Sequence, residues 1–150
     1  MMVYRLSRKR YSEDLSGRGA ELAGGRWNSK GIALVYNGQN ISLCMVEMAV
    51  HLPLGIVSKD YELISIEIPD DEIQELETDK LDWQSALTFI ITRDLGDEFA
   101  MKSEKLVLKV PSAVVQGEFN YLINPRHPKI KKVKIKKVKA FGFDGRLFLR

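Results

Sequence analysis

Short apolar runs separated by polar turns recur along the chain, and their patterns predict both strands and helices. Three runs are predicted to form β-strands: IALVY at 32–36, YELISIEI at 61–68 and EKLVLKV at 104–110. In the second run the alternation places Ile64, Ile66 and Ile68 on one face, as expected where one side of a strand is buried. Pro69 and Pro111 follow the second and third runs, and each should end its strand because proline cannot donate to a hydrogen-bond ladder.

Two further segments have the pattern of helices. A helix is predicted over residues 41–52, for which Asn40 or Ser42 is a suitable N-cap and Pro53 a stop. The segment WQSALTFIITRDLG predicts a second helix, which we expect Gly96 to end, because glycine is favoured directly after a helix. Strands and helices alternate without an internal repeat, so the sequence predicts a mixed α+β fold with central β-sheet structure.

The composition is that of one folded domain covering residues 1–150. The chain is 45% hydrophobic and 29% charged, which is enough apolar material for one sizeable core. No run approaches the roughly 18 apolar residues of a membrane helix, and no apolar signal segment follows the N-terminus. The single cysteine, Cys44, has no disulfide partner. We therefore expect a cytoplasmic protein that does not bind membranes.

A lysine-rich segment near the C-terminus concentrates positive charge, since residues 129–139 hold seven lysines. Val133 and Ile135 alternate with lysines until Lys137 shifts the phase, which predicts a strand with a bulge. Lysines along an edge strand prevent edge-to-edge aggregation, and we favour this interpretation. Binding of nucleic acid or other anions stays open as the alternative. The absence of helix-turn-helix, zinc-finger and RNP signatures argues against direct DNA binding.

The predicted helix over residues 41–52 contains an anomaly. It is apolar nearly all round and should be buried, yet Glu47 lies in its middle. A buried carboxylate without a partner is costly. Glu47 is therefore expected either to pair with an arginine or with His51 one turn later, or to face a cleft and act there.

The segment GGRWNSKG, residues 24–31, combines flexible backbone with groups that bind anions. Its glycines suit a turn, in which Asn28 is expected to make local hydrogen bonds, and they also allow a ligand to approach the backbone. Arg26 offers a planar fork for phosphate or carboxylate. The segment matches neither a Rossmann fingerprint nor a P-loop.

A polar cluster follows the third predicted strand. Ser112 occupies a position after a proline near the strand end, where a side chain can point into a cleft. His127 belongs to a loop and has no second ligand nearby, so no metal site is predicted.

Several blocks together carry a resemblance to the RES domain, the toxin half of RES-Xre toxin–antitoxin modules. In order along nearly the whole chain they are YRLS, GGRWNSKG, VY with Tyr36, SLCMVEMAVHL, LISIEIPDD, VPSAVV, NYLINPRHP and FDGRLF. The chain departs from the family pattern in its lysine-rich segment and at Gly145, where proline is expected. The resemblance implies a fold similar to mono-ADP-ribosyltransferases and a reaction that consumes NAD.

The resemblance also assigns residues. The family's catalytic positions fall on Glu47 and Arg26, and its substrate-binding positions on Tyr36, Ser112, Gly25, Asn120 and Arg5. NAD is implied as the substrate, with no further cofactor and no metal. The implied partner is an Xre-like helix-turn-helix antitoxin, and homodimer formation stays open.

These residue types suit cleavage of the bond between nicotinamide and ribose. Glu47 would stabilise the positive charge that develops on the ribose, and Arg26 would bind the pyrophosphate or the nicotinamide-side ribose phosphate. Tyr36 would stack on nicotinamide, while Ser112 would either bind its carboxamide or orient Glu47. The sequence thus predicts a toxin that depletes NAD as a glycohydrolase or phosphorolase and arrests growth. The alternatives are a mono-ADP-ribosyltransferase of a host protein and a non-enzymatic module that binds anions or nucleic acid.

Overall fold

A mixed β-sheet forms the framework of the computed structural model, which describes residues 1–53, 59–79, 81–83 and 85–148. Within these residues the sheet has seven strands in the order β4-β5-β6-β2-β1-β3-β7. The strands are β1 (Met2–Arg8), β2 (Val35–Gly38), β3 (Tyr61–Glu67), β4 (Ile73–Glu75), β5 (Val107–Pro111), β6 (Phe119–Ile123) and β7 (Lys134–Ala140). The helices are α1 (Arg18–Ala23), α2 (Ile41–His51) and α3 (Leu87–Lys102), with short 3-10 turns at Lys9–Tyr11, Asp70–Glu72, Ile130–Lys132 and Gly145–Phe148. The predicted mixed α+β class is confirmed, and none of the described helices is long and apolar enough to cross a membrane.

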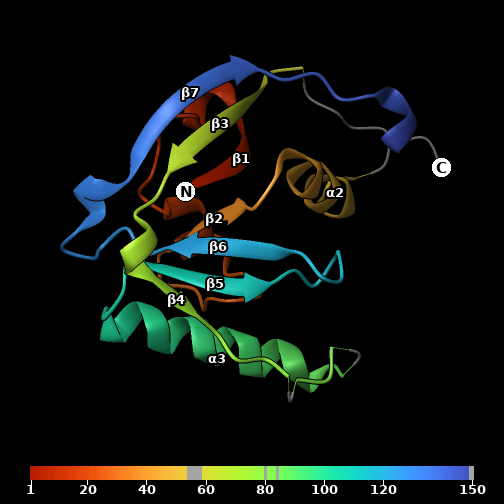
Figure 1. Cartoon of the computed structure of the whole chain (residues 1–150). Helices are drawn as coiled ribbons and strands as arrows, with labels where there is room; N and C mark the ends of the chain where they lie inside the picture. Colours follow the sequence, from red (N-terminus) through yellow and green to blue (C-terminus); the bar gives the residue numbers. More distant parts are fainter. Residues whose placement is uncertain (54–58, 80, 84, 149–150) are drawn as a thin grey trace.

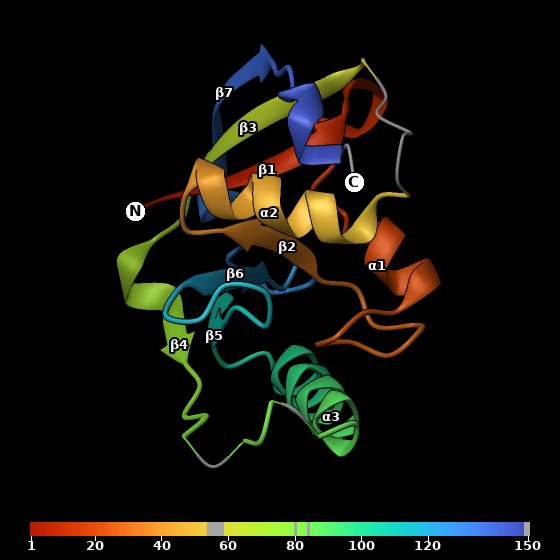
Figure 2. The same cartoon turned by 90° about the vertical axis from the view of Figure 1, so that its right-hand side faces the viewer.

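The sheet divides between β1 and β2. These strands pair only at Tyr4 and Gly38, whereas β1 pairs with β3 along its whole length. Figure 1 shows the consequence: β1, β3 and β7 form one half, and β2, β6, β5 and β4 form the other, turned away from the first. Helix α2 lies beside the divide and α3 covers the β4–β6 half (Figures 1 and 2).

Helix α2 begins as predicted, with the Asn40 side chain accepting from the Leu43 amide at 2.7 Å. The expectation that this helix is buried all round is wrong, because Val46 and Val50 are 39% and 59% exposed. Only one side of α2 packs on the sheet, and it packs tightly at Gly38, where an added Cβ would lie 2.8 Å from the Cys44 sulfur. The remaining apolar surface borders a cavity described below.

The predicted end of the second helix is also wrong. Helix α3 continues past Gly96 to Lys102 and ends where Ser103 adopts a left-handed conformation with φ 53°. Gly96 is buried in the helix interior because the main chain of Trp27 crosses it: an added Cβ would lie 1.7 Å from the Trp27 carbonyl oxygen. The glycine therefore serves close packing between helix and loop.

Two of the three strands predicted from apolar runs form close to where the pattern places them. Strand β3 buries Ile64 and Ile66 completely, Ile68 directly after it is buried as well, and β5 ends at Pro111 as predicted. The third, predicted to start at residue 32, starts only at Val35 as β2. Its first residues are held differently, since the carbonyl of Ile32 accepts from the Asn28 side chain at 2.9 Å.

The lysine-rich strand is an edge strand with a bulge, as predicted. Within the described part of the chain β7 pairs with β3 alone, and the register shifts from Ser65–Lys137 to Ile66–Ile135, which leaves Lys136 as the extra residue. Lys136 forms an exposed ion pair with Glu67 at 3.4 Å. This strand lies at the far edge of its half-sheet, away from the divide (Figure 1).

Candidate active site

A cavity of about 870 Å³ opens at the divide between β1 and β2. Small-molecule sites commonly have volumes of roughly 300–1,000 Å³, so this cavity has the size for a nucleotide-like ligand. Its walls come from β1, β2, β6, α2, the loop around residues 24–27, the start of α3 and the turn after β5. Segments far apart in the sequence therefore meet at one place.

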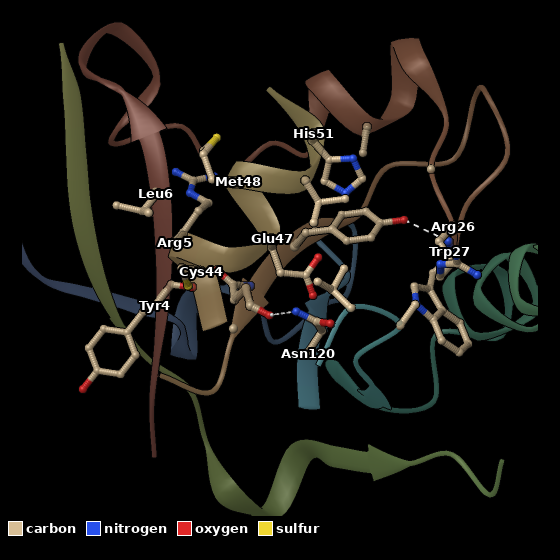
Figure 3. A pocket seen from close by; sticks show the side chains of 18 of the residues that line it. Tyr4, Arg5, Leu6, Arg26, Trp27, Cys44, Glu47, Met48, His51 and Asn120 are labelled. Carbon is tan, nitrogen blue, oxygen red and sulfur yellow. Dashed lines mark hydrogen bonds between the residues drawn. The ribbon is translucent and has the colours of Figure 1, made fainter. Parts of the chain in front are cut away.

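Glu47 lies in the middle of this cavity (Figure 3). Its half-buried carboxylate accepts a hydrogen bond from the Ser112 hydroxyl at 3.0 Å. Among the described residues Glu47 has no ion pair with an arginine and no hydrogen bond with His51. The two structural pairings expected for this carboxylate are therefore not found among these residues. The Glu47 carboxylate therefore faces the cavity with Ser112 as its hydrogen-bond partner.

Ser112 is buried, and its hydroxyl is fully used. The oxygen accepts from the amides of Val114 and Val115 at 3.1 and 3.0 Å, and its single proton goes to Glu47. Of the two roles considered for Ser112, this geometry supports orientation of Glu47, since no donor is left for a ligand.

Arg26 lies on another side of the cavity from Arg5 in the view of Figure 3. Its neighbour Trp27 is buried in a core cluster with Phe99 and Leu108, which fixes the loop. The Arg26 guanidinium lies 5.5 Å from the centre of the Phe89 ring and forms no ion pair among the described residues, so its charge is available to a ligand.

Tyr36 and Asn28 set the shape of the glycine-rich loop. The Tyr36 hydroxyl donates to the Asn28 side-chain oxygen at 2.6 Å and accepts from the Trp27 amide at 3.1 Å. Burial raises the pKa of the Tyr36 hydroxyl, so it stays protonated. An added Cβ at Gly25 would lie 2.8 Å from that hydroxyl. Gly25 is thus needed for loop packing, and the ring of Tyr36 lines the cavity.

Asn28 itself is completely buried, and its side-chain amide donates to the carbonyls of Ala20, Ser29 and Ile32. The predicted local hydrogen bonds of Asn28 are therefore confirmed.

Arg5 has a partly structural position. Its guanidinium donates to the main-chain carbonyls of Tyr11, Ser12 and Asp14, which holds the turn after β1. Burial lowers the pKa of Arg5, and the Asp14 carboxylate partly opposes this effect. The side chain still contributes a positive wall to the cavity.

Asn120 comes from β6 and lies below Glu47 in Figure 3. Its side-chain amide donates to the Asn37 carbonyl at 3.3 Å, which joins β6 to β2 beside the divide. The structure therefore brings every predicted site residue to the cavity or, for Ser112, to direct contact with a residue that lines it.

Two other groups limit the chemistry of the cavity. Burial raises the pKa of the Cys44 thiol to about 11, so this cysteine is neutral and a poor nucleophile. The described residues contain no group of three or more His, Cys, Asp or Glu side chains that could hold a metal ion. Of the cavity's side chains, the Glu47 carboxylate is thus the one suited to stabilise positive charge.

Sequence reasoning missed several residues that line the cavity. His51 was considered only as a partner of Glu47, although its position one helical turn later already indicated the same side of α2. Asn37 and Phe89 carry no local signal, because their places depend on the divided sheet and on the packing of α3.

Comparison with known proteins places the chain in a family. Residues 2–145 match the RES domain. A protein of Photorhabdus laumondii named Toxin Res is 39% identical over 98% of this chain and 97% of its own length. A protein of a Sphingobium species named Prs ADP-ribosylating toxin is 35% identical over 91% of this chain and 88% of its own.

A solved structure supports the fold. The crystal structure of the M. tuberculosis MbcT–MbcA toxin–antitoxin complex matches with a TM-score of 0.73 at 18% identity, covering 98% of this chain and 86% of the matched chain. The predicted family is confirmed: the chain belongs to the RES domain family.

Proposed function

We propose that this protein binds NAD in the cavity at the divide and cleaves the bond between nicotinamide and ribose. The observation that carries the proposal is Glu47, a carboxylate facing a cavity of nucleotide size and oriented by a buried serine. The cations Arg5 and Arg26 also line this cavity, which suits a ligand with a pyrophosphate.

Each group has a role in this reaction. When nicotinamide leaves with the electron pair of the broken bond, positive charge develops at the ribose, and Glu47 stabilises it. Arg26 holds the pyrophosphate, while the Tyr36 ring stacks on the nicotinamide. Ser112 orients Glu47 and does not touch the substrate. NAD is the substrate, and the reaction needs no further cofactor.

The acceptor of the ADP-ribosyl group distinguishes two versions of the function. Transfer to water or phosphate would deplete NAD and arrest growth, and this is the version we favour for a toxin. Transfer to a host protein is the alternative, and the name of the Sphingobium relative, Prs ADP-ribosylating toxin, supports it. The non-enzymatic alternative has less support, because no lysine of β7 lines the cavity.

Product analysis tests the proposal. The purified chain is incubated with NAD, with and without inorganic phosphate, and the products are followed by proton NMR. We expect free nicotinamide together with ADP-ribose or, in phosphate, ADP-ribose 1″-phosphate. Nicotinamide release that requires added cell extract, with ADP-ribose attached to a protein, would support the alternative. No nicotinamide under any condition would refute the proposed function.

We further propose that an antitoxin protein binds this chain and closes the cavity. The matched solved structure, MbcT–MbcA, is a toxin–antitoxin complex, which supports such a partner. The Xre-like type of the partner, homodimer formation, a cytoplasmic location and a single domain over residues 1–150 stay predictions from the sequence. Coexpression with the product of the adjacent gene should restore growth, and a complex that leaves NAD turnover unchanged would contradict the blocking mechanism.

A further inference from the structure

Helix α3 contacts the Arg26 loop through Thr92, Gly96 and Asp97. Thr92 and Gly96 are four positions apart and therefore lie on the same side of the helix, and Asp97 directly follows Gly96. None of them lines the cavity.

The contacts hold the main chain that follows the Arg26 side chain. Directly after it, the Thr92 hydroxyl shares its single proton between the Arg26 carbonyl at 2.8 Å and the Phe89 carbonyl at 3.1 Å. Three residues further on, Asp97 accepts from the Ser29 amide at 2.7 Å and from the Ser29 hydroxyl at 2.5 Å. Thr92 is completely buried, and hydrogen bonds to a charged group such as Asp97 are stronger than neutral ones.

The middle of the loop is fixed by shape. Gly96 meets the Trp27 carbonyl so closely that no side chain fits between helix and loop. The first turn of the same helix supplies Phe89, whose ring lies under the Arg26 guanidinium at 5.5 Å. Helix α3 therefore contacts both the main chain at Arg26 and the guanidinium at the end of its side chain.

We propose that Thr92 and Asp97 are positioning residues for Arg26, so that α3 sets the pyrophosphate-binding geometry of the cavity. This inference rests on the proposed function, in which Arg26 binds NAD. An arginine fork recognises a phosphate through two parallel hydrogen bonds, and a displacement of about 1 Å is enough to lose that match.

A structural role alone makes different predictions. If the contacts served only stability, their loss would lower the unfolding temperature and leave the affinity of folded protein for NAD unchanged. If they position Arg26, their loss acts through that side chain, so removing Arg26 first should abolish the effect. A double-mutant cycle measures this coupling.

The test compares Asp97→Ala with Asp97→Asn and with the control Asp94→Ala. Asp94 is exposed on the same helix, and its removal changes the charge equally without touching the loop. For each variant, and in combination with Arg26→Ala, we measure KM and kcat for NAD, the Kd for ADP-ribose and thermal unfolding.

We expect Asp97→Ala to raise KM and the Kd for ADP-ribose about tenfold, with kcat changed less, since pyrophosphate binding is shared by ground state and transition state. Asp97→Asn keeps an oxygen for the Ser29 amide and should stay within about threefold of the parent. Asp94→Ala should resemble the parent. In the Arg26→Ala background, Asp97→Ala should add less than about twofold.

Equal effects of Asp97→Ala with and without Arg26 would overturn the inference, as would an unchanged Kd. If Asp97→Ala does not fold, Thr92→Val carries the same test, because it removes the hydroxyl bound to Arg26 and keeps the shape. A parent protein that neither binds ADP-ribose nor turns over NAD would instead refute the proposed function.

Discussion

Replacing Glu47 by glutamine separates a catalytic carboxylate from a structural one. The change keeps nearly the same shape and removes the negative charge. The Ser112 hydroxyl, 3.0 Å from the carboxylate, can donate equally to an amide oxygen. No ion pair is broken within the described residues, so the fold loses only the difference between a charged and a neutral hydrogen bond.

The two expected magnitudes differ widely. Loss of that difference should cost about 1 kcal/mol of unfolding free energy or less. A half-buried charge about 4 Å from a developing cation, at an effective dielectric constant of about 20, contributes roughly 4 kcal/mol. This corresponds to a factor of about 10³, and measured losses for such groups are typically about 10²–10³-fold. Stability should therefore barely change while NAD cleavage nearly stops.

The assay measures thermal unfolding and nicotinamide release on the same preparation. Glu98→Gln is the matched control, since Glu98 is exposed on α3 and its one ion pair among the described residues is with Lys102. A Glu47→Gln variant that folds normally and cleaves NAD at the parent rate would remove Glu47 from the mechanism. A loss of about 3–5 kcal/mol in stability would instead indicate a buried ion pair.

Three other changes test neighbouring parts of the reasoning. Ser112→Ala leaves two amides and Glu47 without their hydrogen-bond partner, so it should lower kcat about tenfold and the free energy of unfolding by about 1–2 kcal/mol. Ser112→Thr keeps a hydroxyl and should retain most activity. Equal kcat values for the two variants would contradict orientation of Glu47 by the hydroxyl. Because the pKa of Cys44 is raised to about 11, its thiolate forms only as the pH rises toward that value. At pH 8 the folded protein should react with iodoacetamide roughly two hundred times more slowly than the urea-unfolded chain, measured by mass spectrometry, and equal rates would show an accessible thiolate. Three lysines of the lysine-rich segment lie outside the cavity: Lys132, Lys134 and Lys136. Replacing all three by glutamine at once should leave the rate of NAD turnover within about twofold of the parent rate. Loss of turnover in a folded variant would tie the lysine-rich strand to the site.

Features with a local cause could be predicted from the sequence. The N-cap at Asn40 depends on the next few residues alone, and the buried face of β3 follows from alternation. The bulge near Lys137 likewise appears as a break in the pattern of β7. Glu47, Arg26 and Ser112 also have local signals, but only the family resemblance implied that they belong to one site, since no local rule connects Glu47 with Ser112.

Errors occurred where distant contacts override local preference. Gly96 resembles a helix end in sequence, and only the crossing main chain of Trp27 explains a glycine inside a helix. The start of IALVY has the composition of a strand, yet Asn28 takes the hydrogen-bonding place of a strand partner at Ile32. Apolar residues on every side of α2 predicted full burial, whereas Val50 borders a cavity.

The cavity itself follows from the uneven pairing of β1, which no pattern in the sequence predicts. This strand pairs with β3 along its whole length but with β2 only at Tyr4 and Gly38. Beyond that pair the two strands separate, and the Asn37 side chain donates to main-chain carbonyls beside the divide, on Val35 and Tyr121. If β1 and β2 were paired along their length, the sheet would be continuous and the space that Glu47 faces would be closed. The candidate site is therefore a property of the divided sheet, because the divide brings the proposed catalytic residues to one cavity.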